Sequence, residues 1–169
     1  YINRARKEGA RDFGACMSPH TAFLVLQGME TLNLRMERHI KNTRDIVSFL
    51  SSHESVKSVC YPELENHPDH ELSKELLPNG CGAVFTFEIE GNIETGKKFI
   101  EQLNLFSHLA NVGDAKSLVI HPASTTHHRM NAEDLKKAGI SESTIRLSIG
   151  IEDSKDLIED LDEALTYST

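Results

Sequence analysis

Two segments of the chain carry apolar residues at every second position, and this pattern constrains the fold more than any other feature. The apolar positions are Ala83, Phe85, Phe87 and Ile89 in the first segment and Ile145, Leu147, Ile149 and Ile151 in the second. A period of two residues predicts a β-strand whose apolar face must be covered by other elements. We therefore expect a sheet with at least one buried face.

Apolar residues that recur every three or four positions predict helices beside this sheet. A long one begins at Ser18-Pro19, with serine as N-cap and proline at the first helical position, and runs to about residue 53 as one helix or two joined by a bend. The other expected helices cover residues 71–77, 92–103, 131–139 and 153–165, and the other short strands cover residues 55–61, 105–110 and 117–120. This order predicts an α/β (α+β) two-layer fold, a small, mainly antiparallel sheet with helices on one side, preceded by a long helix.

The composition excludes several classes of protein. The chain has 169 residues, 38% of them hydrophobic, and a net charge of −8, which argues against nucleic acid as a partner. No apolar stretch approaches a membrane span and no signal-peptide pattern is present, so we expect a cytoplasmic protein. Three cysteines without C-x-x-C spacing indicate neither a disulfide framework nor a zinc site. Residues 1–16 lack an initial methionine, and we interpret them as the continuation of a longer chain.

Arg146 is the charged residue of the second alternating segment, and alternation places it on the face opposite the apolar residues. A guanidinium can hold a carboxylate through two parallel hydrogen bonds, which a lysine cannot do. The sequence leaves two interpretations open. Arg146 either forms a structural ion pair or binds an anionic ligand.

A loop rich in histidine and hydroxyl residues invites a metal-site or nucleophile hypothesis. It lacks the H-E-x-x-H pattern of zinc enzymes and the G-x-S-x-G turn of a nucleophilic serine, and His67 and His70 elsewhere lack a third ligand. We therefore expect no metal and interpret these side chains as bonded to the backbone. The loop residues are His121, Ser124, Thr125, Thr126, His127 and His128.

Several long phrases, taken together, resemble one protein family. They are G-A-C-M-S-P-H-T-A-F-L-V-L-Q-G-M-E-T-L-N-L-R-M-E-R-H (14–39), Y-P-E-L-E-N-H-P-D-H-E-L (61–72), L-A-N-V-G-D-A-K-S-L-V-I-H-P-A-S-T-T-H-H (109–128) and I-R-L-S-I-G-I-E-D (145–153). The sequence is similar to the C-terminal part of the O-acetylhomoserine sulfhydrylases (O-acetylhomoserine aminocarboxypropyltransferases), within the Cys/Met-metabolism group of pyridoxal-phosphate (PLP) enzymes.

The resemblance implies a division of the chain. Residues 1–17 would end a large PLP-binding domain, residues 18–54 would form a long connecting helix, and residues 55–169 would form the small C-terminal domain of a fold-type I PLP enzyme. The cofactor lysine would belong to the large domain. None of the ten lysines here sits in a family-like Schiff-base motif, and Lys116 is expected to be exposed. No catalytic residue is therefore expected in this segment.

The resemblance also implies roles for individual residues. Arg146 matches the arginine that binds the substrate α-carboxylate, and Asn111 matches a position that holds the same group. Ser117 and Thr126 are second-tier candidates for lining the site. Related lyases and cystathionine γ-synthases usually carry serine at the position of Asn111, and the phrase H-P-A-S-T-T-H is typical of the sulfhydrylase branch.

The implied reaction belongs to methionine biosynthesis: sulfide replaces acetate on O-acetylhomoserine to give homocysteine, with PLP as the electron sink. The implied partners are a small amino-acid substrate and further copies of the chain in a tetramer-type homo-oligomer. Two alternatives stay open. The chain could come from a cystathionine γ-synthase or methionine γ-lyase relative, or act as an isolated, non-catalytic assembly module.

Overall fold

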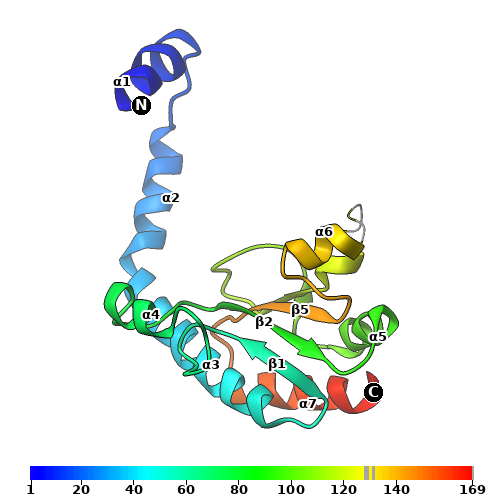
Figure 1. Ribbon diagram of the computed structural model, residues 1–169. Coiled ribbons are helices and arrows are strands. Elements are labelled where there is room, and N and C mark those ends of the chain that lie inside the picture. Colours follow the sequence, from blue (N-terminus) through cyan, green and yellow to red (C-terminus); the bar gives the residue numbers. More distant parts are fainter. Residues whose placement is uncertain (128–129, 131, 169) are drawn as a thin grey trace. The chain divides into compact units, whose positions relative to one another are not determined.

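The computed structural model describes residues 1–127, 130 and 132–168 (Figure 1). Two compact units divide the chain, Tyr1–Leu34 and Arg35–Thr169. No helix among the described residues is both long enough and apolar enough to cross a membrane.

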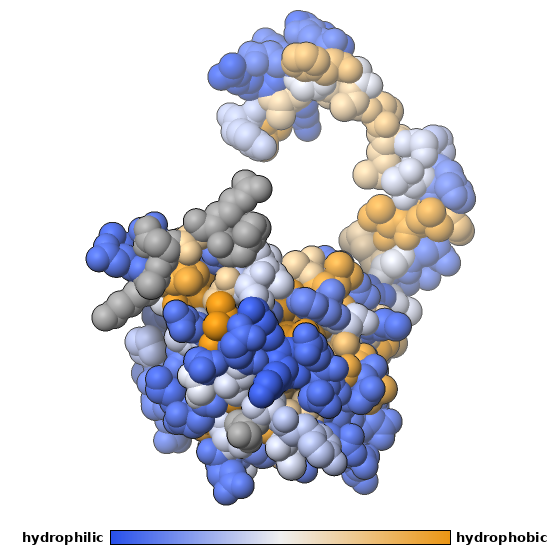
Figure 2. All heavy atoms as spheres, turned by 90° about the vertical axis from the view of Figure 1, so that its right-hand side faces the viewer, coloured by the Kyte–Doolittle hydropathy of each residue, from blue (hydrophilic) through white to orange (hydrophobic). Residues whose placement is uncertain are grey.

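The first unit is helical. It contains α1 (Ile2–Arg4), the π-helix η1 (Ala5–Asp12) and α2 (Pro19–Glu30). The Ser18 hydroxyl caps α2 by accepting a hydrogen bond from the Thr21 amide at 3.1 Å, as the sequence predicted. None of the α2 residues is buried within the described chain, and apolar side chains lie on the surface of this unit (Figure 2).

The long helical run is two helices. The backbone leaves the helical conformation at Thr31, and α3 (Leu32–Ser52) follows. The buried residues of α3 begin at His39, and Thr43, Ile46, Val47 and Leu50 are among them. Of the two interpretations, the one with two helices is therefore correct.

The second unit is built on a five-stranded sheet. Its strands are β1 (Val56–Cys60), β2 (Val84–Ile89), β3 (Ser107–His108), β4 (Leu118–Ile120) and β5 (Thr144–Ser148). The order across the sheet is β1-β2-β5-β4-β3, and only the pairing of β3 with β4 is parallel. The prediction of a small, mainly antiparallel sheet is confirmed, and β5 lies at its centre.

One face of this sheet forms the core. Phe85, Phe87, Ile145 and Leu147 are buried in one cluster with side chains of α3, α5 (Ile93–Gln102) and α7 (Ser154–Ser168). Figure 1 shows α3 and α7 below the strands and the short helix α6 (Ala132–Lys137) above them. Asn131, expected near the start of α6, lies outside the described residues. Two short helices, α4 (His70–Leu76) and η2 (Pro122–Ser124), complete the unit.

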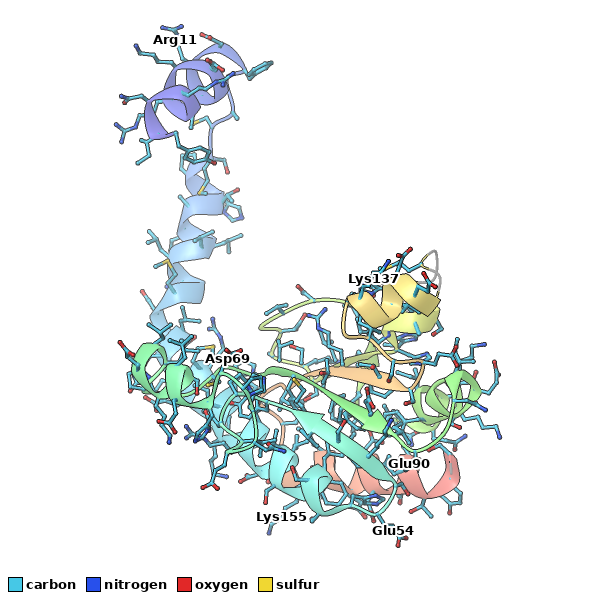
Figure 3. The ribbon with its side chains drawn as sticks, viewed as in Figure 1. Arg11, Glu54, Asp69, Glu90, Lys137 and Lys155 are labelled. Carbon is cyan, nitrogen blue, oxygen red and sulfur yellow. The ribbon has the colours of Figure 1, made fainter. Side chains whose placement is uncertain are left out.

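Charged side chains cover the exterior of this unit. Glu54, Asp69, Glu90, Lys137 and Lys155 are exposed and point outward from five separate segments (Figure 3). The three acidic residues in this set, Glu54, Asp69 and Glu90, lie on separate segments of the unit.

Helix α5 begins with a reciprocal cap. The Asn92 side chain accepts from the amides of Glu94 and Thr95 at 2.9 and 3.3 Å, and the Thr95 hydroxyl accepts from the Asn92 amide at 3.3 Å. Four residues beyond the cap, Gly96 lies against the ring of His121. Because of this contact, α5 and the histidine loop are packed together.

We expect Gly96→Ala to destabilise the protein, although alanine is ordinarily the better helix former. A Cβ at this position would lie 2.7 Å from His121 Nε2. Such overpacking typically lowers the free energy of unfolding by about 1–3 kcal/mol, which denaturant titration would measure. The same change in a His121→Ala background is the control, because removal of the ring removes the clash. Equal losses in both backgrounds would contradict this explanation.

Candidate functional site

Arg146 occupies the middle of the central strand β5. It is in register with Thr86 of β2 on one side and with Ile120 of β4 on the other. The flanking residues Ile145 and Leu147 are fully buried on the helix-covered face, whereas Arg146 is partly exposed on the opposite face. This is the orientation that alternation predicted.

The guanidinium of Arg146 has a backbone partner. Its Nη2 donates to the carbonyl oxygen of Asn111 at 3.3 Å, which joins two predicted site residues that are 35 positions apart. Over residues 1–127, 130 and 132–168, no ion pair joins Arg146 to a carboxylate. The structural ion pair that the sequence left open is therefore not formed within this part of the chain, and the guanidinium retains donors for an anion.

Asn111 lies in an exposed turn after β3. Its Oδ1 accepts from the Val112 amide at 2.9 Å, and its Nδ2 lies 3.3 Å from a carboxylate oxygen of Asp114. Gly113 has a φ of +75°, a conformation that favours glycine. The turn is thus ordered by its own side chains, and it presents a carbonyl group to Arg146.

The two second-tier candidates lie in different environments. Ser117 is fully buried, and its hydroxyl donates to Glu152 at 3.0 Å and accepts from the Gly150 amide at 2.8 Å. Thr126 is exposed, and its hydroxyl lies 2.8 Å from His127 Nδ1. Among the described contacts, neither side chain reaches Arg146.

Two polar groups near this strand were given no role by the sequence: Ser148, which alternation places on the Arg146 face, and Glu152. Ser148 shares the Arg146 face of β5 and is buried, and its hydroxyl has no hydrogen-bond partner within the described residues. Glu152 follows the strand and receives two hydrogen bonds from Ser117. No local signal marks Glu152, because its partner lies 35 residues away in the sequence.

The histidine loop is held together by its own hydrogen bonds. His121 is buried, with Nε2 2.7 Å from the Glu142 carbonyl oxygen and Nδ1 2.8 Å from the Ser124 hydroxyl. Because a carbonyl can only accept, Nε2 carries the proton and Nδ1 accepts from Ser124. The Thr125 hydroxyl donates to the His121 carbonyl at 2.8 Å. These bonds agree with the loop-ordering interpretation, and His128 lies outside the described residues.

The same arrangement predicts a pH dependence. Burial of the imidazole lowers the pKa of His121, and the bond to the Glu142 carbonyl does not offset this effect. The unfolded chain therefore binds the proton more readily, so stability is complete above the unfolded pKa of about 6.5 and falls as the pH drops below it. We expect the free energy of unfolding to decrease between pH 7 and pH 5. In His121→Gln this part of the slope should disappear, and an unchanged slope would contradict the assignment.

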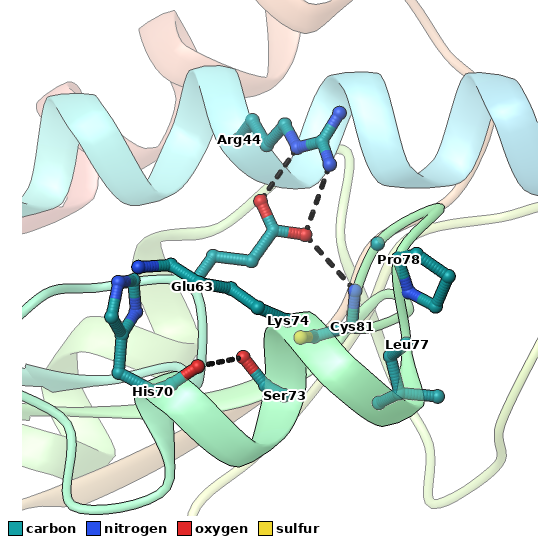
Figure 4. A pocket seen from close by; sticks show the side chains of 9 residues that line it. Arg44, Glu63, His70, Ser73, Lys74, Leu77, Pro78 and Cys81 are labelled. Carbon is teal, nitrogen blue, oxygen red and sulfur yellow. Dashed lines mark hydrogen bonds and ion pairs between the residues drawn. The ribbon is translucent and has the colours of Figure 1, made fainter.

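A cavity of 380 Å³ lies between α3 and α4, in a part of the unit that none of the site residues lines (Figure 4). Two charged residues of its lining pair with each other: Arg44 Nε lies 2.6 Å from Glu63, which also accepts from the Cys81 amide at 3.0 Å. Burial opposes ionisation of Glu63, but the bonds from Arg44 and Cys81 outweigh it and lower the pKa of the carboxyl group. The polar network therefore joins α3 to the 61–82 segment. No group of three or more potential metal ligands occurs among the described residues.

Comparison with known proteins identifies what this chain is similar to. The family described as Cys/Met metabolism PLP-dependent enzyme matches residues 2–166. O-acetyl-L-homoserine sulfhydrylase 1 of Thermus thermophilus is 46% identical over 98% of this chain and 39% of its own length. L-methionine gamma-lyase of Pseudomonas putida is 40% identical over 99% of this chain and 42% of its own length.

A solved structure shows the same architecture. A Campylobacter jejuni protein assigned as an O-acetylhomoserine (thiol)-lyase superposes with a TM-score of 0.89 at 44% identity, over 97% of this chain and 39% of that one. That structure contains N′-pyridoxyl-lysine-5′-monophosphate, at a position outside the matched segment. The present chain spans about two fifths of the length of the relatives it matches.

Proposed function

Because the chain belongs to the Cys/Met metabolism family of PLP-dependent enzymes, we propose that it is the substrate-carboxylate-binding part of an O-acetylhomoserine sulfhydrylase. The whole enzyme would make homocysteine from O-acetylhomoserine and sulfide. The observation that carries the proposal is a guanidinium on the central strand, beside Asn111 and without a carboxylate partner in the described chain. The relatives named as sulfhydrylases support the reaction type.

The chemistry of Arg146 suits this role. Its guanidinium can grip the two oxygens of an α-carboxylate, and a bidentate grip fixes direction as well as position. Holding the carboxylate would align the α-carbon for reaction, which is an effect of orientation and not of proton transfer. The Asn111 carbonyl would keep the guanidinium turned toward the substrate when its other donors are used.

The donor set fits a substrate better than it fits the cofactor. The family depends on PLP, which when bound withdraws electrons from the substrate α-carbon. Arg146 and Asn111 supply a guanidinium and amide groups, which suit a carboxylate, but no amine that could hold PLP covalently. Lys116, the nearest lysine in the sequence to Asn111, is exposed. Within this chain, the proposed contribution is therefore limited to binding and orienting the substrate.

We also propose the domain division and assembly that the family resemblance implies. Residues 1–17 would end the PLP-binding domain, residues 18–54 would connect it to the small domain, and residues 55–169 would form that small domain. The whole protein would be a cytoplasmic homo-oligomer. Support for the assembly comes from α2, whose apolar side chains are exposed within this chain. A helix with apolar residues around its surface is normally covered in the complete protein. Light scattering of the full-length protein would test the assembly.

A lyase is the second candidate, since relatives named L-methionine gamma-lyase are 40% identical. Asn111 favours the sulfhydrylase, because the related lyases usually carry serine there. The deciding experiment supplies the full-length, PLP-loaded protein either with O-acetylhomoserine and sulfide or with methionine alone. We expect homocysteine in the first reaction and little 2-oxobutyrate in the second. The reverse result would assign a lyase, and inactivity in both would favour a non-catalytic assembly module.

A further inference from the structure

The Glu152 carboxylate holds the far end of the Asn111 loop. Its two oxygens accept from the Ser117 amide at 2.7 Å and from the Ser117 hydroxyl at 3.0 Å. Hydrogen bonds to a charged acceptor are stronger than those between neutral groups. The same hydroxyl accepts from the Gly150 amide at 2.8 Å, so Ser117 is bonded to both Gly150 and Glu152 in the segment that follows β5.

Helix α3 holds this chain segment from the other side. The Asn42 amide donates to the carbonyl oxygens of Gly150 and Glu152 at 3.1 and 2.8 Å. His39 Nδ1 lies 2.6 Å from the Ile149 carbonyl oxygen. Asn42 and His39 are both buried. The backbone around Glu152 is thus held in place by buried side chains of α3, independently of the exposed loop.

The loop and the strand end are in direct contact. The Ile151 amide donates to the Ala115 carbonyl at 2.9 Å, and the Ser107 amide donates to the Ser117 carbonyl at 3.0 Å. A Cβ on Gly150 would collide with the Ala115 carbonyl oxygen and with Lys116. Only glycine therefore allows residues 115–117 to lie this close to residues 150–152.

These contacts connect Glu152 to the proposed site. The loop leaves the sheet after β3, carries Asn111 next to Arg146, and returns to the sheet at Ser117. We propose that Glu152 is a positioning residue: through Ser117 it sets the loop so that the Asn111 turn stays beside Arg146. The inference rests on the proposed function, since it assumes that this site binds the substrate carboxylate.

Loss of the Glu152 contacts would release the loop and leave the Arg146 side chain in place. A displacement of about 1 Å in a binding group can weaken a reaction by up to about a hundredfold. Release of the loop should therefore weaken the binding of ligands that carry a carboxylate. A ligand that lacks this group would bind as before, because it does not use the Asn111 turn.

The test uses Glu152→Ala, Glu152→Gln and Ser117→Ala in the full-length, PLP-loaded protein, with the exposed Asp156→Asn as the matched control. Two inhibitors are compared, an amino acid and the corresponding amine without the carboxylate. For Glu152→Ala we expect KM for the amino-acid substrate and the inhibition constant of the acid to rise about tenfold or more, with kcat changed less than threefold. The amine should be unaffected. Glu152→Gln, which keeps one acceptor oxygen, should show a smaller change.

Three results would decide against the inference. Equal weakening of acid and amine would indicate general loss of structure, and no change in either would show that the loop does not depend on Glu152. If Glu152→Ala does not fold, the inhibition constants of acid and amine are compared in Ser117→Ala and Glu152→Gln instead. If these variants do not weaken binding of the acid more than binding of the amine, the proposal is overturned. Arg146→Ala separates the two hypotheses. If Arg146→Ala also weakens acid and amine equally, or neither, the proposed function is wrong. If Arg146→Ala weakens binding of the acid alone and the Glu152 variants do not, only the role of Glu152 is overturned.

Discussion

Arg146→Ala in the full-length enzyme is expected to lower kcat/KM for O-acetylhomoserine by roughly a hundredfold or more. The substitution removes the charged donors that face the proposed carboxylate position and leaves the strand pairings with Thr86 and Ile120 unchanged. A charge-assisted contact of this kind contributes on the order of 2–4 kcal/mol of transition-state binding. Steady-state kinetics with varied O-acetylhomoserine would measure the loss.

Arg146→Lys is the matched variant. Lysine keeps the positive charge but cannot reproduce the two parallel hydrogen bonds, so an intermediate kcat/KM is expected. Thermal unfolding of both variants should remain close to that of the parent, because the side chain is partly exposed and outside the core cluster. A change in kcat/KM of less than twofold for the alanine variant would rule out the carboxylate-binding role.

Asp160→Ala is expected to cause a large loss of stability, about 2–4 kcal/mol in the free energy of unfolding. Asp160 is buried on α7, and its carboxylate accepts from the amides of Asn104, Leu105 and Phe106 at 2.8, 3.0 and 3.4 Å. These bonds hold the segment between α5 and β3 to the last helix. Alanine would leave the three amides without this acceptor.

Denaturant titration of the full-length protein, combined with hydrogen exchange of the peptide covering residues 104–106, would measure this effect. Asp160→Asn keeps one acceptor oxygen and should lose less stability. The exposed neighbour Glu159→Ala is the control, with an expected change within about 0.5 kcal/mol. Unaltered exchange at residues 104–106 in Asp160→Ala would contradict the explanation.

Local patterns predicted most of the elements of this fold. Alternation predicted β2 and β5, the Ser18 cap marked the start of α2, and the expected helix 92–103 corresponds to α5. The parallel pairing of β3 with β4 could not be predicted, because strands of two and three residues carry too little periodicity. The break at Thr31 was likewise ambiguous, since apolar residues continue at helical spacing on both sides of it.

The site was only partly predictable, for a different physical reason. Alternation oriented Arg146, and family resemblance supplied Asn111 as its companion. The roles of Glu152 and Asp160 could not be predicted, because their partners lie 35 and 54 to 56 residues away and nothing in their own segments requires these contacts. Ser117 was expected to line the site, whereas the structure shows a hydroxyl already bonded to Glu152 and Gly150. Whether Ser117 also meets the substrate stays a prediction.

The place of Arg146 on the central strand determines which neighbouring positions tolerate substitution. Strand β5 is hydrogen-bonded on both edges, so a change in its backbone would disturb β2 and β4 together. The Asn111 turn lies outside these ladders, and its Val112-Gly113 tip is exposed. Substitutions between the end of β3 and the contact at Ala115 would therefore leave the sheet intact. Residues of the turn can therefore be exchanged without disturbing the strand that carries Arg146, the residue proposed to hold the substrate carboxylate.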